Sequence, residues 1–382
     1  MKKFLLKLIV GYFLIINFVA AQTLPSPVIA AKSWLLLDVT ANQYLALENV
    51  DVKMEPASLT KLMTAYVTFS ALQTKKISLD QKVNVSERAW KVDRSSSKMF
   101  IDPATPVSIN DLLYGLMVQS GNDAAIALAE AVAGTEDTFV NLMNREAQRI
   151  GMKNTHFSNP HGLPSPENYS TARDLSLLAT RIILEYPQFY KIDSTKYFTY
   201  NKITQPNRNR LLWLDPSVDG MKTGHTDNAG YCLIASAKRP NGNGERRLLS
   251  VVLGADSDQA RIQESQKLLN WGYQNFDAVK LYTKGQVVAK PELWKGKKNQ
   301  LNIGFNRDIY LSLPKGNVGK IKPILETKTP LLAPITEGQT IGTLKVVIEG
   351  KKITEFPVVA LEKVEQANVF GSAWDSIRLW FK

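Results

Sequence analysis

The sequence predicts an α+β protein, an antiparallel sheet flanked by helices, followed by a small all-β sandwich domain. The chain has 382 residues, 44% hydrophobic and 21% charged, which allows two domains and a sizeable core. Strand-like segments stand at both ends of the first ~280 residues, with helical segments between them. From Lys284 onward, short alternating runs take over. This order indicates a sheet built from both ends of the first region and covered by its helices.

The first region opens with a predicted strand pair. Ser33–Asp38 and Gln43–Leu47 flank the turn signal Thr40-Ala41-Asn42. Apolar spacing then predicts helices over Ser58–Leu72, after the capping box at Ser108, and over Asn122–Val132, Thr138–Ile150 and Ser170–Ile183. Two apolar strands and a last helix complete the region, over Tyr231–Ala237, Leu248–Leu253 and Ile262–Tyr273.

The second region predicts an all-β domain over residues 285–366. Its runs, such as IYLSL and TLKVVIE, alternate apolar and polar residues between Gly and Pro turns. No cluster of catalytic residue types occurs in this part of the sequence. We expect a spacer or binding domain.

The tail, residues 367–382, predicts an amphipathic helix. Phe370, Ala373, Trp374, Ile377 and Trp380 recur at three- and four-residue spacing. A helix of this kind lies in the membrane interface with its aromatic rings at headgroup depth, so we expect it to anchor the chain on an anionic membrane surface. The alternative is a helix packed back on the β domain.

The N-terminus has the order of a secretory signal. Lys2, Lys3 and Lys7 precede the apolar run Leu8–Val19, and small residues follow up to Ala21. We predict a signal peptide over residues 1–21; an uncleaved anchor is the alternative. Removing it changes the net charge from +12 to 12 − 3 = +9. With no nucleic-acid fold signature, an anionic envelope surface is the better partner for this exported, basic chain.

The remaining composition argues against a metal or a redox role. Cys232 is the single cysteine, so no internal disulfide forms. It stands in the run YCLIASA, which favours a buried inert thiol over a reactive one. His156, His161 and His225 form no metal-ligand spacing, and we predict no cofactor.

The pattern Ser-x-x-Lys occurs three times, beginning at Ser58, Ser95 and Ser312. Ser95 stands in a polar segment with no periodic run after it. Ser312 stands in a strand-like run, and Pro314 argues against a helix there. Only Ser58 begins a helical run, where Lys61, three residues on, shares its face.

A serine hydroxyl becomes a good nucleophile only when a base takes its proton. Lys61 serves if burial or neighbouring cations keep it neutral, and its neighbours Leu59, Leu62 and Met63 suit burial. The alternative is a helix cap at Ser58 with Lys61 as a solvated surface charge.

Two further short motifs favour the nucleophile and base over the helix cap and surface lysine. Ser120-Gly121-Asn122 falls between two helices, where a hydroxyl can relay a proton and an amide can hold a substrate carbonyl. Lys222-Thr223-Gly224 precedes the strand YCLIASA, where Lys and Thr can hold a carboxylate and Gly admits a substrate backbone.

The ordered triple Ser-x-x-Lys, Ser-x-Asn and Lys-Thr-Gly is the signature of penicillin-recognising serine enzymes. The phrases EPASLTKLMTAY, VQSGNDAA, FSNPHGL, STARDL and VDGMKTGHTDNAGYCLIASAKR make the chain resemble the D-alanyl-D-alanine carboxypeptidases among the low-molecular-mass penicillin-binding proteins. The resemblance covers essentially the whole chain. It implies a β-lactamase/transpeptidase-like fold for the catalytic domain, residues 22–284.

The resemblance also implies roles for individual residues: nucleophile Ser58, general base Lys61, proton relay Ser120, substrate-amide contact Asn122, and the carboxylate-side box Lys222, Thr223 and Gly224. The backbone N–H groups of Ser58 and His225 would form the oxyanion hole. Arg208 and Arg261 match positions near the substrate carboxylate, with solvated charges as the alternative. His161 matches a residue at the site rim, or else a packing histidine.

The expected activity is removal of the terminal D-alanine from peptidoglycan stem pentapeptides through an acyl-enzyme, at the periplasmic face of the inner membrane. β-Lactam antibiotics would acylate the same serine. A β-lactamase is a rival, but no Glu-x-x-x-Asn occurs over residues 159–180, where Glu167 is followed directly by Asn168. The sequence is also compatible with a D,D-endopeptidase or transpeptidase on the same fold, and with a non-catalytic envelope-binding protein.

Overall fold

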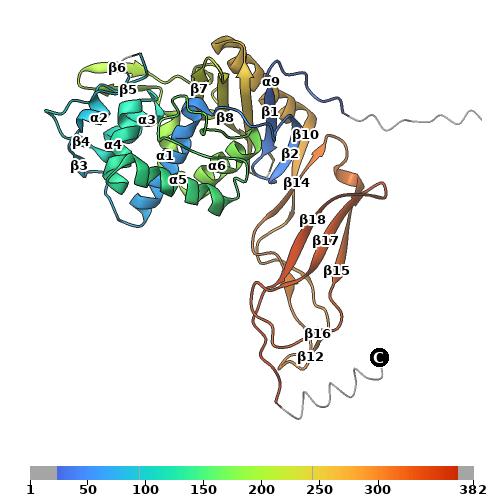
Figure 1. The fold of residues 1–382 in the computed structure, drawn as a ribbon. Coiled ribbons are helices and arrows are strands. Elements are labelled where there is room, and N and C mark those ends of the chain that lie inside the picture. Colours follow the sequence, from blue (N-terminus) through green and yellow to red (C-terminus); the bar gives the residue numbers. More distant parts are fainter. Residues whose placement is uncertain (1–23, 94, 243, 369–382) are drawn as a thin grey trace, which may run out of the picture.

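The centre of the catalytic region is a five-stranded antiparallel sheet in the order β2-β1-β9-β8-β7 (Figure 1). The computed structural model describes residues 24–93, 95–242 and 244–368. The strands are β1 (Ser33–Asp38), β2 (Gln43–Glu48), β7 (Val218–Thr226), β8 (Gly230–Pro240) and β9 (Glu245–Ala255). β1 pairs with β9, so the two ends of the region meet in one sheet, as predicted from the order of the segments.

Helices cover both faces of this sheet, which explains why β1 is buried along its whole length. Leu35 and Leu37 face the main apolar core, while Trp34 and Leu36 face a second core that includes Leu268. Side chains alternate along a strand, so one strand serves both cores. α9 (Asp258–Asn275) packs on the second face.

The other helices form the helical layer on the first face (Figure 1). They are η1 (Ala57–Thr60), α1 (Lys61–Gln73), α2 (Glu87–Trp90), α3 (Ile109–Met117), α4 (Asn122–Ala133), α5 (Glu136–Ile150), α6 (Ala172–Glu185), α7 (Pro187–Tyr190) and η2 (Lys191–Ser194). The short α8 (Leu211–Leu214) lies beside β7 instead, and its Leu211 and Leu212 belong to the second core. Two small hairpins complete the domain, β3 (Lys82–Val83) with β4 (Val107–Ser108) and β5 (Tyr197–Tyr200) with β6 (Ile203–Pro206).

Local signals set the ends of several helices. The Ser108 hydroxyl accepts a hydrogen bond from the Asp111 backbone N–H, which confirms Ser108 as the helix cap, and it donates to the Asp111 carboxylate. α5 begins two residues before the predicted Thr138, because Thr135 caps it. α1 differs more: Ser58 lies inside the 3₁₀ turn η1 that leads into the helix, and its side chain makes no cap hydrogen bond.

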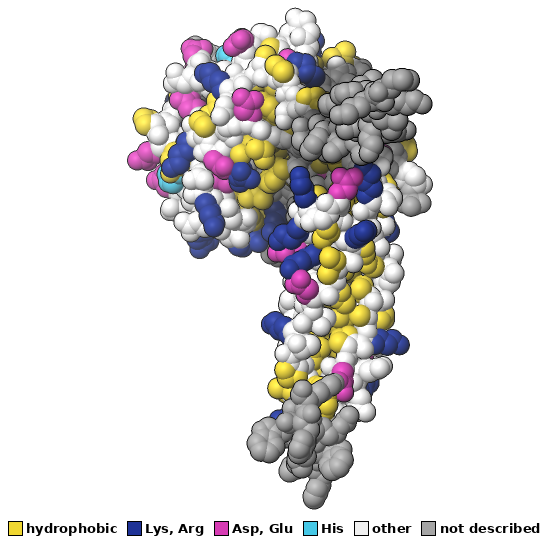
Figure 2. Space-filling view, turned by 90° about the vertical axis from the view of Figure 1, so that its right-hand side faces the viewer, with side chains coloured by type: hydrophobic (Ala, Val, Ile, Leu, Met, Phe, Trp, Pro, Cys, Tyr) yellow, Lys and Arg dark blue, Asp and Glu magenta, His cyan; other side chains and the backbone are white. Residues whose placement is uncertain are grey.

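The C-terminal region is all-β, as predicted, and has its own apolar core. One five-stranded sheet has the order β11-β13-β18-β17-β15. Its strands are β11 (Val287–Ala289), β13 (Ile303–Gly304), β15 (Ile321–Thr327), β17 (Thr340–Ile348) and β18 (Lys351–Ala360), and β12 (Leu293–Trp294), β16 (Leu331–Leu332) and η3 (Val318–Lys320) lie beside it. The domain is elongated and points away from the helices (Figure 1), and hydrophobic side chains run along the face seen in Figure 2.

The two domains are joined by β10 (Phe276–Tyr282), which pairs with β14 (Ile309–Pro314), and by a buried polar cluster. The Arg246 guanidinium lies 2.7 Å from the Asp38 carboxylate, and both side chains are buried. The Ser312 hydroxyl donates to the same carboxylate. This third Ser-x-x-Lys serine is therefore part of the domain junction.

The predicted signal peptide, and the predicted tail helix from residue 369 onward, lie outside the described residues. Among the helices of the described ranges, none has the length and hydropathy needed to cross a membrane. Cys232 is buried in β8, and burial raises the pKa of its thiol to about 11, in keeping with an inert thiol.

Candidate active site

Ser58 and Lys61 meet where η1 runs into α1. The Lys61 Nζ lies 2.9 Å from the Ser58 hydroxyl oxygen, so the i, i+3 spacing brings the two side chains together. Ser58 is half-buried, whereas Lys61 is fully buried. The surface alternative for Lys61 is therefore wrong. Ala57, just before the serine, has a φ of +47°, a left-handed conformation that is rare for a residue with a side chain and is common at functional sites.

Burial keeps about half of the Lys61 amine neutral at pH 7. The pKa of the Lys61 amine is lowered to about 7: burial is the largest cause, the Asp123 carboxylate acts in the opposite direction, and the Arg208 guanidinium adds to the lowering. The amine also donates a 2.6 Å hydrogen bond to the His161 carbonyl. When neutral, it keeps that hydrogen bond and has a lone pair for the Ser58 proton.

Ser120 and Lys222 form a second serine–lysine pair, from opposite sides of the site. The Lys222 Nζ donates to the Ser120 hydroxyl at 2.8 Å and to the Thr223 carbonyl at 3.0 Å. Ser120 has a φ of +65°, in the bend between α3 and α4. Burial lowers the pKa of Lys222 well below its usual range, and the cations Lys61, Arg208 and Arg261 lower it further.

Asn122 and Asp123 begin α4 and have separate tasks. The buried Asn122 side-chain oxygen has no hydrogen-bond partner in the described structure, which leaves it free for a ligand. The Asp123 carboxylate accepts hydrogen bonds from the backbone N–H groups of Met99, Phe100 and Ile101. Asp123 thus fixes the segment beside the cavity, although burial raises its pKa.

His161 and Gly162 close the site behind Lys61. His161 is 5% exposed, and burial and Lys61 lower its pKa to about 3, so the ring is neutral. Its Nδ1 accepts from the Leu163 N–H, which makes it a packing histidine that orients a carbonyl toward Lys61. Gly162 has a φ of +85°, and a Cβ there would lie 1.9 Å from the Ala57 carbonyl oxygen.

The Lys-Thr-Gly box lies inside the edge strand β7, with Thr223 and Gly224 on the cavity wall. A Cβ at Gly224 would lie 3.1 Å from the Pro56 carbonyl oxygen, so the strand passes close to the turn that carries Ser58. Arg261, from α9, donates to the Gly224 carbonyl at 2.9 Å and is 6% exposed. It is a structured cation, in contrast to the solvated alternative.

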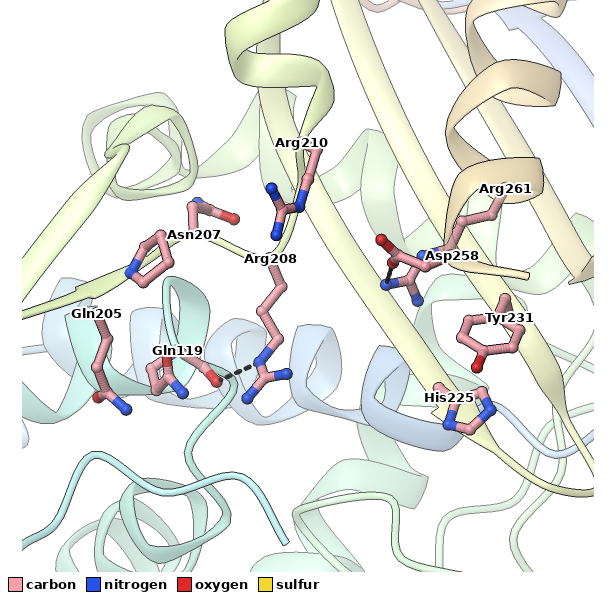
Figure 3. Close-up of a pocket in the computed structure, with 10 residues that line it drawn as sticks. Gln119, Gln205, Asn207, Arg208, Arg210, His225, Tyr231, Asp258 and Arg261 are labelled. Atoms are coloured by element: carbon pink, nitrogen blue, oxygen red, sulfur yellow. Dashed lines mark hydrogen bonds and ion pairs between the residues drawn. The ribbon is translucent and has the colours of Figure 1, made fainter.

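The second arginine comes from the loop after β6. Arg208 donates to the Gln119 carbonyl at 3.2 Å and lines the cavity. Partial burial and the neighbouring Arg261 lower its pKa. Figure 3 shows Arg208 and Arg261 on opposite sides of the open space next to His225.

These side chains surround a cavity of about 240 Å³. Its predicted members are Ser58, Ser120, Asn122, His161, Arg208, Thr223, Gly224, His225 and Arg261. The two remaining predicted residues, Lys61 and Lys222, are buried behind the wall and reach the cavity through their bonds to Ser58 and Ser120.

Sequence reasoning missed part of this wall. Ser95, Ser96 and Ser97 line the cavity too, although nothing in the sequence around Ser95 predicts a place in the site. The Ser95 hydroxyl donates to Asp93, so it forms no pair of the Ser58–Lys61 kind. This polar segment lies at the cavity because it contacts the start of α4, where the Asn122 N–H donates to the Ser97 carbonyl. No local signal in the sequence reveals that contact.

Comparison with known proteins identifies the family. Residues 20–257 match the family described as D-alanyl-D-alanine carboxypeptidase. The D-alanyl-D-alanine carboxypeptidase DacC of Escherichia coli is 43% identical over 370 residues, covering 95% of this chain and 92% of that protein. The chain belongs to the D-alanyl-D-alanine carboxypeptidase family. It is accordingly a serine-type carboxypeptidase, a hydrolase of the penicillin-binding group.

Solved structures agree with this carboxypeptidase fold. Residues 276–366 match the C-terminal domain of penicillin-binding protein 5. Penicillin-binding protein 5 from Haemophilus influenzae is similar with a TM-score of 0.86 and 42% identity, covering 90% of this chain and 100% of that one. Penicillin-binding protein D2 from Listeria monocytogenes, in its cefotaxime-bound form, has a TM-score of 0.59 and 31% identity, covering 65% of this chain and all of that one.

Proposed function

We propose that this carboxypeptidase works through an acyl-enzyme on Ser58, with Lys61 as the base. The observation that carries the proposal is the 2.9 Å contact between the Ser58 hydroxyl and a buried amine whose pKa is lowered to about 7. A neutral amine beside a hydroxyl, held by a backbone carbonyl, is a poised nucleophile and base.

Acylation begins when a stem peptide lies along β7 in the cavity. Ser58 Oγ attacks the carbonyl carbon of the penultimate D-alanine, and its proton passes to the Lys61 amine. The backbone N–H groups of Ser58 and His225 stabilise the tetrahedral oxyanion. The C–N bond then breaks and terminal D-alanine leaves; its nitrogen takes the proton that Lys61 accepted from Ser58, relayed by the Ser120 hydroxyl, so Lys61 is neutral again. The 2.8 Å contact between Ser120 and Lys222 supports this relay.

Deacylation reverses the roles with water as nucleophile. Lys61 takes a proton from water, the hydroxide attacks the ester carbon, and Ser58 Oγ leaves and regains its proton. The pentapeptide has then become a tetrapeptide plus free D-alanine. Asn122, whose side-chain oxygen is unpaired, holds the peptide amide N–H through both steps.

The substrate's terminal carboxylate gives the site its preference for a chain end. Arg208 and Arg261 bring two cations, and Thr223 a hydroxyl, to the cavity wall, and the buried Lys222 amine lies behind it, bonded to Ser120. Guanidinium groups hold carboxylates through paired hydrogen bonds. A peptide that continues past this point would leave those cations without a partner.

The same serine is expected to react with β-lactams. Incubating the mature chain with benzylpenicillin and measuring intact mass tests this directly. We expect one drug mass added to wild type and to Ser95→Ala, whose hydroxyl lines the same cavity, and none to Ser58→Ala. D-Alanine release from diacetyl-L-lysyl-D-alanyl-D-alanine should follow the same pattern.

Each other outcome of these experiments would contradict the proposal in a different way. An unmodified wild type with the drug consumed favours a β-lactamase. An unmodified wild type with drug and peptide untouched favours a non-catalytic binding protein. An adduct that persists on Ser58→Ala refutes the nucleophile.

We also propose where the carboxypeptidase works. The sequence supports cleavage of residues 1–21 on export to the periplasm, a catalytic domain over 22–284, a β spacer over 285–366 and an anchoring helix over 367–382. Deleting residues 367–382 should release the mature chain from vesicles that contain anionic lipid without loss of D-alanine release. Equal vesicle binding by both chains would refute the anchor.

A further inference from the structure

A second cavity, of about 440 Å³, opens beside the catalytic one. The two share Arg208, His225 and Arg261 in their walls. The second wall is completed by Gln119, Gln205, Pro206, Asn207, Arg210, Tyr231 and Asp258. In Figure 3, Arg208 and Arg210 stand on one side of this space, and Arg261, Asp258 and Tyr231 on the other.

The charge of this second cavity is positive. Three guanidinium groups and one carboxylate line it, so the formal sum is 3 − 1 = +2. The carboxylate, Asp258, is paired with Arg261. The Arg210 guanidinium makes no hydrogen bond or ion pair within the described ranges of the chain. The cavity therefore holds an unpaired cation among polar amide side chains, which suits an anion.

The position of the cavity fixes which part of a substrate reaches it. In the proposed reaction, the leaving residue lies between Ser58 and the cations that hold its terminal carboxylate. Arg208 and Arg261 are among those cations and form the shared wall. A longer side chain on the leaving residue would therefore enter the second cavity, which is larger than a D-alanine methyl group requires.

Resting on the proposed function, we propose that the second cavity binds a carboxylate on the side chain of the leaving residue, with Arg210 as the residue that recognises it. The enzyme would then release acidic D-amino acids as well as D-alanine. The reaction is the same hydrolysis. The C–N bond to the leaving residue breaks, the hydroxyl group of water adds to the acyl carbon and its proton goes to the amine, so water is the only co-reactant.

Three peptides test this proposal: diacetyl-L-lysyl-D-alanine followed by D-alanine, D-glutamate or D-glutamine. D-Glutamate and D-glutamine have the same shape and differ in charge. We expect kcat/KM for the D-glutamate peptide to exceed that for the D-glutamine peptide by about fivefold at low ionic strength, as for a partly exposed ion pair, and the ratio to fall as salt is added.

The variants Arg210→Gln and Arg145→Gln make the test specific to the cavity. Arg145 is an exposed arginine on α5, away from both cavities. Arg210→Gln should bring the ratio to about one, and Arg145→Gln should leave it at about five.

A wild-type ratio near one, a ratio unchanged in Arg210→Gln, or cleavage of the D-alanine peptide alone would each overturn the proposal. Failure of the wild type on the D-alanine peptide would instead refute the proposed function.

Discussion

Acylation of Ser58 by penicillin is expected to follow the ionisation of Lys61. Only the neutral amine can accept the serine proton, and burial lowers the pKa of Lys61 to about 7. The neutral fraction is then about 1% at pH 5, about half at pH 7 and about 99% at pH 9. The second-order rate constant should rise roughly a hundredfold from pH 5 to a plateau near pH 9.

The assay is stopped-flow acylation with a fluorescent penicillin, read as the growth of protein-bound fluorescence. The drug's carboxylate is ionised throughout this range. His161 does not contribute, since its pKa is lowered to about 3. The exposed imidazole of His225 lines the cavity, so a His225→Gln variant serves as its control. We expect the same midpoint in that variant.

Charge substitutions near Lys61 test separately whether the acid limb of the rate profile follows the pKa of Lys61. Arg208 lowers the pKa of Lys61, so Arg208→Gln should raise that pKa and move the acid limb to higher pH, whatever it does to the maximum rate. Asp193 raises the pKa of Lys222, and it is not among the groups that shift Lys61. Asp193→Asn should therefore leave the midpoint in place.

Two results would refute this reasoning. A rate constant that stays level between pH 5 and 9 excludes Lys61 as a base that titrates near neutrality. An acid limb that moves in Asp193→Asn assigns the ionisation to the Lys222–Asp193 pair, since burial also raises the pKa of Asp193 well above its usual range.

Three further predictions concern stability. The pKa of Lys61 is lowered from its ordinary 10.5 to about 7 in the folded protein, so burying the charged amine costs up to about 5 kcal/mol of folding free energy below pH 7, and progressively less as the pH rises to 10.5. Thermal unfolding should therefore show Lys61→Met more stable than wild type at pH 7, although the lost hydrogen bond to the His161 carbonyl reduces the difference. This difference in stability should be smaller at pH 10. Gly162→Ala should slow acylation at least about tenfold and destabilise the fold by about 2 kcal/mol, because its Cβ would meet the Ala57 carbonyl; rates and urea titrations check it. Arg246→Met should cost about 3–5 kcal/mol in urea unfolding, since the Asp38 charge is left buried and unpaired; a loss below about 1 kcal/mol would contradict this.

Local contacts were the part of the site that the sequence could predict. Ser58 and Lys61 are three residues apart in a helical segment, so backbone geometry alone brings them together. The Ser120–Lys222 bond joins residues 102 positions apart, and only the family resemblance linked them. Arg210 gave no signal, because an exposed arginine after a turn has no periodic or spacing feature that separates it from a surface charge.

The fold shows the same division. The strands on either side of the first region were predictable because β1 and β9 are apolar along most of their length. The strand β7 has no such pattern: VDGMKTGHT contains two glycines and several polar residues, which depress β-propensity. Those residues are there because this edge faces the cavity, so the requirements of the site override the usual strand pattern.

In the proposed mechanism, the crowding of basic side chains lets one site hold a neutral base and still select a chain end. Lys61, Lys222, Arg208 and Arg261 converge on one cavity, and Lys61, Arg208 and Arg261 each lower the pKa of at least one other member. Burial and this repulsion together hold the pKa of Lys61 near 7. In the proposed complex, a terminal carboxylate would offset this repulsion, whereas an internal peptide bond would bring no charge. Repulsion in the empty site would thus favour the binding of peptides with a free terminal carboxylate over the binding of internal peptide segments.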